Sequence, residues 1–216
     1  MPTISYLNPA TAALFDSAWE CYRAGYAGPP WNEWKKCESC GRSFGLEIGD
    51  NTDCTNCQTT LVDYWPKAQI AADIMGSLKR YEGVCITAQH EGEVVGLTVG
   101  YNIPTADLRR ELELSSFSAA YPRVTYQDEI VVRPDWQGKG IGRALYMAWH
   151  GWAKLHGERF LFARTLSDPP TVVYSWYQRL GYGRGFDYPE PDKRVILRFD
   201  TQDWWRLGDN WHGTIT

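Results

Sequence analysis

The spacing of apolar and polar residues along the chain predicts strands that alternate with helices. Residues 84–90 and 93–103 are rich in apolar and β-branched side chains and are separated by Glu91 and Gly92, so we expect a β-hairpin there. Further strands are expected at residues 2–7, 124–133, 159–166 and 195–200. Because helical segments lie between these strands, the pattern favours an α/β or α+β class, in which helices pack on a sheet.

The first helix is expected just after Asn8 and Pro9, which suit an N-cap and a first helical position. Leu14 and Ala18 stand four residues apart and begin an apolar helical stripe, and Gly25 is expected to end it. Further helices are expected at residues 66–81, 105–114, 138–156 and 169–180, and loops at residues 26–36 and 115–123.

The composition of the 216 residues describes a folded, mildly acidic chain. Hydrophobic residues make up 44% and charged residues 22%, and the formal net charge is −4, so a sizeable core is expected. Nucleic-acid-binding proteins usually carry a basic patch, so this charge argues against nucleic acid as a partner. No stretch is apolar enough to span a membrane, and the start lacks the regions of a signal peptide. We therefore expect a cytoplasmic protein without a membrane partner.

A glycine-rich turn follows the strand expected at residues 124–133. Gly138, Gly140 and Gly142 stand directly before an amphipathic helix. Glycines let backbone N–H groups approach a phosphate, and a helix N-terminus adds unpaired donors and partial positive charge. The spacing fits neither Gly-x-Gly-x-x-Gly nor Gly-x-x-x-x-Gly-Lys-[Ser/Thr], which disfavours Rossmann and P-loop sites. The alternative is a structural turn that binds nothing.

Two ordered motifs resemble one known family. Gln137-x-x-Gly140-x-Gly142, after Val-Arg-Pro-Asp-Trp, is similar to the acyl-CoA motif of the GNAT superfamily of N-acetyltransferases. Tyr177, four residues before Gly181, is similar to a tyrosine in the closing helix and turn of that family. The resemblance covers most of residues 1–25 and 64–200, including the hairpin segment 90–96.

The resemblance implies a mixed, mostly antiparallel sheet that is flanked by helices and splayed between its fourth and fifth strands, where the pantetheine of acetyl-CoA binds. It implies an acetyltransferase domain at residues 1–200 that carries an insert at residues 34–62. A Trp-rich tail at residues 201–216 could cap the core or form a homodimer contact. The residues implied to bind the cosubstrate are Ile130, Val131, Val132, Gln137, Gly138, Lys139, Gly140, Ile141, Gly142 and Arg143.

The resemblance also implies direct attack of an amine on the thioester within a ternary complex. Tyr177 matches the tyrosine that commonly protonates the leaving thiolate, although its ring could instead pack under the cosubstrate. The general base is expected to be Asp128 or Glu129, which strand alternation places on opposite faces, so at most one faces the acceptor. Either carboxylate could instead be a surface or hydrogen-bonding group.

The sequence departs from the ribosomal-protein N-terminal acetyltransferases that it resembles. Those enzymes have Glu twelve residues and Asn seven residues before the donor tyrosine, whereas this chain has Thr165 and Pro170 there. Protein N-terminal acetylation is therefore disfavoured. Asp168 and the prolines after it are instead expected to begin a helix, with Asp168 as the N-cap.

Two Cys-x-x-Cys pairs lie in the predicted insert, Cys37 with Cys40 and Cys54 with Cys57. This spacing is typical of a zinc ribbon, in which four thiolates hold one structural zinc ion and leave no open position. Iron is the alternative metal. The metal could simply stabilise a long loop, or the insert could help to select the acceptor, because the resemblance implies that this connection borders the acceptor site. The other two cysteines are expected in the core.

The leading interpretation is acetylation of a cationic small-molecule amine. Residues 28–65 carry six acidic and three basic side chains, and four thiolates on zinc would add a charge of about −2. Trp31, Trp34, Tyr64 and Trp65 could offer apolar walls or ring faces to an ammonium group. These charges could also merely solvate the surface. The alternatives are a protein or peptide lysine acetyltransferase and a catalytically silent, CoA-binding interaction module.

Overall fold

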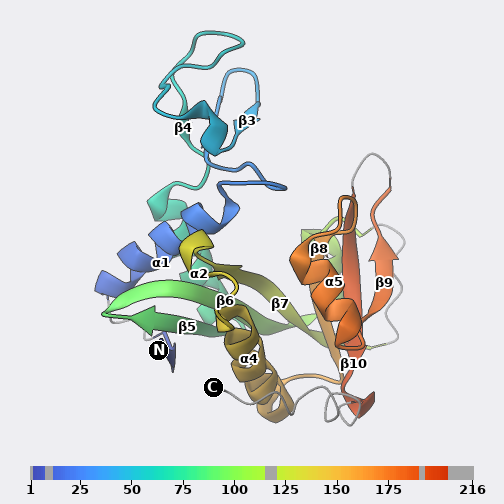
Figure 1. Cartoon of the computed structure of the whole chain (residues 1–216). Coiled ribbons are helices and arrows are strands. Elements are labelled where there is room, and N and C mark those ends of the chain that lie inside the picture. The colour runs from blue at the N-terminus through green and yellow to red at the C-terminus, as the bar shows by residue number, and fades with distance from the viewer. Residues whose placement is uncertain (1, 8–11, 115–120, 190–192, 204–216) are drawn as a thin grey trace. The chain divides into compact units, whose positions relative to one another are not determined.

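The predicted hairpin forms the middle of the chain. In the computed structural model, which describes residues 2–7, 12–114, 121–189 and 193–203, β5 spans Val84–His90 and β6 spans Glu93–Pro104 (Figure 1). Glu91 and Gly92 join them with φ angles of 53° and 84°, as a type I′ turn requires. The pattern therefore predicted both strands and the turn correctly.

Seven strands form one sheet in the order β1-β5-β6-β7-β8-β10-β9. The pair β1–β5 and the pairs of β10 with β8 and β9 are antiparallel, whereas β7 and β8 run parallel. The sheet is thus mixed and mostly antiparallel, as expected. The bounds of the other strands are β1 Thr3–Tyr6, β7 Arg123–Val132, β8 Phe160–Leu166, β9 Gly183–Asp187 and β10 Arg194–Asp200.

The parallel pairing of β7 with β8 is short. It runs from the pair Thr125–Leu161 to the pair Gln127–Ala163, while β7 itself continues to Val132. These are the fourth and fifth strands in the order of the sheet. β7 therefore continues for five residues beyond Gln127, its last residue paired with β8.

The chain divides into two compact units, each with its own core. The first unit comprises residues 1–79, 84–99 and 129–149, and includes α1 (Ala12–Tyr26) and α2 (Lys67–Leu78). Its core joins α1, α2, β5, β6 and the end of β7. The buried residues of this core are Leu7, Ala18, Cys21, Tyr22, Ile70, Ile74, Cys85, Val94, Leu97, Val99 and Val131. Both cysteines outside the insert are therefore core residues, as predicted.

The second unit comprises residues 80–83, 100–128 and 150–216, and includes α3 (Thr105–Glu111) and α5 (Val172–Arg179). Its core is aromatic, with Tyr101, Tyr126 and Phe162 among its buried members. The long helix α4 (Ile141–His156) contributes residues to both units. None of the helices in the described residues combines the length and apolar character needed to cross a bilayer.

The insert folds as a small element of its own within the first unit. A three-stranded sheet in the order β3-β2-β4 consists of Ser43–Phe44, Lys35–Lys36 and Val62–Asp63. A separate hydrophobic cluster fills it, formed by Cys37, Phe44, Ile48, Cys54 and Leu61. Figure 1 shows this segment, in light blue and cyan, between α1 and α2 in the chain and beyond their ends in space.

Several helix ends differ from the prediction. α4 begins at Ile141 rather than near residue 138, because the turn before it holds two glycines in the left-handed region. The expectation that Asp168 caps a helix is wrong: α5 begins at Val172, and the Thr171 hydroxyl caps it by accepting from the Tyr174 N–H at 2.9 Å.

Two further elements differ from the pattern. α2 ends at Leu78 rather than near residue 81, and β9 was not predicted. β9 escapes a pattern search because it holds two glycines in five residues, Gly183 and Gly185, and exposes most of its side chains. The expected cap at Asn8 and Pro9 and most of the Trp-rich tail lie outside the described residues. The homodimer contact therefore stays a prediction.

Candidate active site

The turn between β7 and α4 presents backbone donors. A 3₁₀ turn at Pro134–Trp136 leads into Gly138 and Gly140, whose φ angles are 73° and 81°. A Cβ at either position would meet nothing within 4 Å. Glycine is therefore needed there for its backbone conformation and not for lack of space. The first bond of α4 runs from the Ala144 N–H to the Gly140 oxygen at 3.0 Å, so the N–H groups of residues 141–143 precede it. Such a helix start suits an anion.

Ion pairs and a hydrogen bond of neighbouring side chains hold the turn in place. Arg133 pairs with Glu93 at 3.1 Å and with Asp135 at 2.9 Å. Gln137 donates from Nε2 to the Val132 carbonyl at 3.1 Å, which ties the turn to the end of β7. The residues predicted to bind the cosubstrate thus form one continuous stretch: Ile130, Val131 and Val132 end β7, Gln137, Gly138, Lys139 and Gly140 form the turn, and Ile141, Gly142 and Arg143 begin α4.

Glu129 is half-buried and held by two phenols. Tyr22 donates to Oε1 at 2.8 Å, and Tyr26, one turn later on α1, donates to Oε2 at 2.5 Å. Its backbone carbonyl accepts from the Thr98 hydroxyl at 2.7 Å. The two phenols thus hold both carboxylate oxygens of Glu129 against α1. Neither tyrosine was predicted to take part in the site.

Aromatic rings surround these tyrosines. Tyr22 and Tyr26 lie 4.7 Å apart between ring centroids, and the edge of Trp65 contacts Tyr22 at 5.4 Å. Trp31 contacts Tyr26 edge-on at 5.6 Å. Together with Glu129, these four rings form what we call the Glu129 cluster. A carboxylate among aromatic rings is chemically suited to a cationic amine.

Trp34, one of the aromatic residues expected to face an ammonium group, already contacts a cation of this chain. The Arg23 guanidinium lies 3.6 Å from the centre of the Trp34 ring. Arg23 also pairs with Asp63 at 3.0 Å, and Lys35 pairs with the same carboxylate at 2.8 Å. Trp34 therefore packs against a cation of this chain, and the charge of Asp63 is balanced within the first unit.

Asp128 has a different environment from Glu129. It lies near the guanidinium groups of Arg80 and Arg164 and hydrogen-bonds with Tyr101. Burial raises the pKa of Asp128, and the two guanidinium groups oppose that rise. Arg80 is bound in turn by Glu111 at 3.0 Å. Asp128 thus lies in the electrostatic field of two guanidinium groups in the second unit.

Tyr177 lies on α5 and is 1% exposed. Its hydroxyl donates to Oε1 of Gln127, and its ring lies 4.8 Å from that of Tyr182. Burial raises the pKa of Tyr177 well above its ordinary value. The phenol is therefore protonated throughout the physiological pH range.

The four cysteines of the insert converge. Their sulfur atoms all lie within 4.8 Å of one another, with 3.4 Å between Cys37 and Cys57 and 3.7 Å between Cys40 and Cys54. A tetrahedral ion with metal–sulfur bonds of about 2.3 Å would separate its sulfurs by about 3.8 Å, so the donor set fits zinc. A hydrogen bond from Thr59 lowers the pKa of Cys37 to about 6, which favours the thiolate that a metal needs.

The two cysteine pairs have matching turns. The N–H of Gly41 bonds to the Cys37 carbonyl at 2.8 Å, and the N–H of Gln58 bonds to the Cys54 carbonyl at 2.9 Å. Gly41 and Gln58 both have positive φ, at 71° and 59°. This repeated geometry turns both thiols of each pair toward one point.

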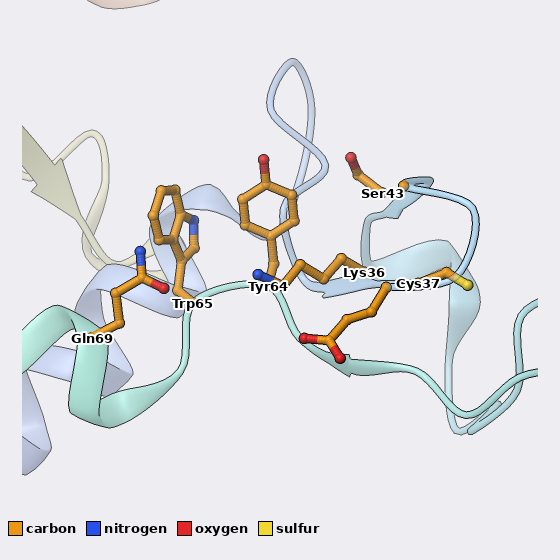
Figure 2. Close-up of a pocket in the computed structure, with 8 residues that line it drawn as sticks. Lys36, Cys37, Ser43, Tyr64, Trp65 and Gln69 are labelled. Carbon is orange, nitrogen blue, oxygen red and sulfur yellow. The ribbon is translucent and has the colours of Figure 1, made fainter. Parts of the chain in front are cut away.

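A groove opens beside the Cys37 turn. It has a volume of about 490 Å³ and lies entirely within the first unit. Figure 2 shows Tyr64 and Trp65 side by side on one part of its wall, with Gln69 beside Trp65 and Ser43 at the opposite end. The residues that line it are Lys36, Cys37, Glu38, Gly41, Ser43, Tyr64, Trp65 and Gln69.

Comparisons with known proteins show which family and which solved structures this chain resembles. The model of the acetyltransferase (GNAT) family matches residues 52–182. PH1933 from Pyrococcus horikoshii OT3 has a similar fold, with a TM-score of 0.60 and 14% identity over 93% of this chain and 98% of that chain. No curated protein matches the sequence.

Two further similar structures are of proteins described with a ligand or an acceptor. The PaiA N-acetyltransferase from Thermoplasma acidophilum, in complex with coenzyme A, has a TM-score of 0.56 and 15% identity over 93% of this chain and 99% of that chain. The ribosomal-protein-S18-alanine N-acetyltransferase from Escherichia coli has a TM-score of 0.53 and 15% identity over 93% and 94%, respectively. At such identities the likeness establishes the fold and leaves the acceptor open.

Proposed function

Because the chain belongs to the acetyltransferase (GNAT) family, we propose that it moves the acetyl group of acetyl-CoA to a primary amine of a small cationic molecule. Family membership provides the enzyme class and the cosubstrate. The observation that carries the proposed acceptor is the Glu129 cluster, in which a carboxylate bound by two phenols lies among tryptophan rings. Such a cluster attracts an ammonium group through both its charge and its ring faces.

The turn from Gly138 to Gly140 and the first residues of α4 bind the pyrophosphate of acetyl-CoA in this proposal. The support is the run of N–H groups ahead of the first helical bond, together with the cationic side chains of Lys139 and Arg143. The pantetheine arm pairs with the backbone at the end of β7, where Ile130 to Val132 extend past the last residue paired with β8.

Glu129 acts as the general base, directly or through one water. An amine attacks only in its neutral form, so a proton must leave the ammonium group before or during attack. Glu129 suits this task better than Asp128, whose carboxylate is engaged by Arg80 and Arg164. The ammonium group first loses one proton to solvent. When the neutral amine then forms the nitrogen–carbon bond and the carbon–sulfur bond breaks, a second proton passes from the nitrogen to Glu129.

Tyr177 supplies the proton that the leaving thiolate of CoA takes up. Its raised pKa keeps the hydroxyl protonated, and its bond to Gln127 holds the phenol in one orientation. The other interpretation of Tyr177, as a ring that only packs under the cosubstrate, predicts that loss of its hydroxyl leaves the rate unchanged.

The four cysteines hold one structural zinc ion in this proposal. Their converging sulfurs and matching turns support it, and four thiolates leave no open position for catalysis. Without the ion, the cluster of Cys37, Phe44, Ile48, Cys54 and Leu61 would be a very small core. The metal therefore stabilises the insert, and with it the part of the groove that Cys37 lines.

The test is release of free CoA from acetyl-CoA in the presence of a panel of amines. Polyamines, aminoglycosides, amino acids and lysine-containing peptides separate a small-molecule acceptor from a peptide acceptor. Release that depends on a small cationic amine supports the proposal. Release with lysine peptides alone would instead identify a protein acetyltransferase, and none with any acceptor would favour a silent CoA-binding module.

A further inference from the structure

The groove beside the Cys37 turn takes no part in the reaction as proposed so far. It is joined to the Glu129 cluster through one residue, because Trp65 lines the groove and also contacts Tyr22 at 5.4 Å and Tyr26 at 6.5 Å. Trp65 is therefore shared by the groove and the Glu129 cluster. All of these residues belong to the first unit.

The groove is lined by one carboxylate and one ammonium group, and a second carboxylate lies beside it. Glu38 lines it and is exposed, and Glu33 accepts from the Trp65 ring N–H at 3.0 Å. Burial raises the pKa of Tyr64, and the charge of Glu33 adds to that rise, which places this carboxylate close to the groove wall. Lys36 is the one cation among the groove-lining residues. The zinc–thiolate centre proposed above, to which Cys37 belongs, would add a further charge of about −2.

Two aromatic rings in this part of the chain already contact cations of the chain itself. Arg23 lies over Trp34 at 3.6 Å, and Lys36 lies over Tyr64 at 5.7 Å. Among the described residues, no cation of the chain lies over the ring of Trp65, which is half-exposed at the edge of the groove. Trp65 thus offers a ring face, with carboxylates nearby, to a cation from outside.

We propose that this groove binds a second ammonium group of the acceptor, and that Trp65 and Glu38 thereby make the enzyme selective for diamines and polyamines over monoamines. This inference rests on the proposed function and specifies its substrate class. Binding of the distal ammonium in the groove fixes the position of the other amine at Glu129, so the second charge contributes to both affinity and orientation.

The experiment compares matched amines on the complete, metal-loaded protein. The ratio of kcat/KM for 1,6-diaminohexane to that for hexylamine is measured in wild type, Trp65→Leu and Glu38→Gln. We expect the ratio to fall by about fivefold to thirtyfold in Trp65→Leu, the size of a partly desolvated cation–π contact. In Glu38→Gln the expected fall is about twofold to fivefold.

Asp50→Asn is the matched control, because it removes the same charge from an exposed position of the same insert that does not line the groove. Calorimetric titration of the CoA-bound protein with 1,6-diaminohexane gives a second readout that needs no turnover. Tighter binding of the diamine than of hexylamine, reduced in Glu38→Gln and kept in Asp50→Asn, supports the proposal.

Three results would overturn it: a wild-type ratio near one, a ratio that neither groove variant changes, or an equal fall in Asp50→Asn and Glu38→Gln. The last would mean that the general field of the insert, and no contact in the groove, selects the acceptor. Because Glu38 is exposed, its substitution tests the idea even if Trp65→Leu fails to fold. Turnover of both amines with equal efficiency would sink the groove proposal alone, whereas turnover of neither would sink the proposed function.

Discussion

The hydroxyl of Tyr26 donates a hydrogen bond to Oε2 of Glu129 across 2.5 Å. The bond holds one oxygen of the proposed base against α1, so its loss should leave the carboxylate less well oriented. We expect Tyr26→Phe to lower kcat/KM by about tenfold or more, the size of a hydrogen bond to a charged group, while acetyl-CoA affinity stays nearly unchanged. Steady-state kinetics with an active amine and calorimetry check this, with the exposed Tyr6→Phe as the control. An unchanged kcat/KM in Tyr26→Phe would argue that Glu129 is not the base.

Loss of the Glu129 carboxylate should have a larger effect than loss of either phenol. Glu129→Gln keeps the size of the side chain and one of the two oxygens that accept from the phenols of α1, but it cannot accept the amine proton. General-base catalysis typically contributes about 10²–10⁴-fold, and we expect a fall in kcat of that order. Asp128→Asn is the comparison. If Asp128→Asn loses more activity than Glu129→Gln, then the assignment of the base is reversed.

Tyr177→Phe should lower kcat while it leaves acetyl-CoA affinity nearly unchanged. That pattern marks an interaction made mainly in the transition state, and a donor role corresponds to about 10²–10⁴-fold. Steady-state kinetics and calorimetry measure the two quantities separately. Wild-type kcat in the Phe variant at every pH would show that Tyr177 only packs.

Gly140→Val should weaken acetyl-CoA binding strongly. With φ at 81°, this position is strained for a β-branched residue, and the turn would have to rearrange and withdraw its N–H groups. Gly49→Val is a matched control, because Gly49 also has positive φ, at 57°, but lies in the insert away from the turn. Calorimetric affinities of the two variants should differ widely, and equal affinities would refute the role of the turn.

One metal ion per chain is expected after dialysis. Elemental analysis should find zinc, and Cys40→Ser should lose both the ion and much of the stability of the insert, because the remaining core of the insert is small. Cys85→Ser is the control, since Cys85 is buried in the core of the first unit and should leave the metal content intact. Metal-free wild-type protein with an unchanged melting temperature would exclude this role.

His150 should make the fold sensitive to acid. Burial lowers its pKa to about 3, from 6.5. Between these values the unfolded chain binds a proton that the folded protein does not, so the stability that His150 contributes falls as pH falls through this window. The slope is about 1.4 kcal/mol per pH unit for one proton. Urea unfolding at several pH values should show a shallower slope in His150→Gln than in wild type.

The parts of the molecule that follow from local sequence were the predictable ones. The hairpin, the glycine turn and the cysteine spacing each depend on residues within a few positions of one another. The Glu129 cluster does not, because Tyr22 and Glu129 are 107 residues apart and only the tertiary fold brings them together. Tyr22 on the first predicted helix was the available hint, and its aromatic character is equally typical of a core residue. Tyr26 fell in the predicted loop at residues 26–36, because α1 continues one residue past the expected end at Gly25.

The insert enters and leaves its host at a single point. Lys35 pairs with Asp63, and Lys36 pairs with Val62, so the two ends lie side by side as neighbouring strands. The insert therefore occupies the place that a simple hairpin loop would take in the rest of the chain. A gene for such an enzyme could gain or lose the intervening segment in one event and still encode the same host fold. The proposed metal-binding segment can thus be exchanged as a cassette, independently of the glycine turn between β7 and α4.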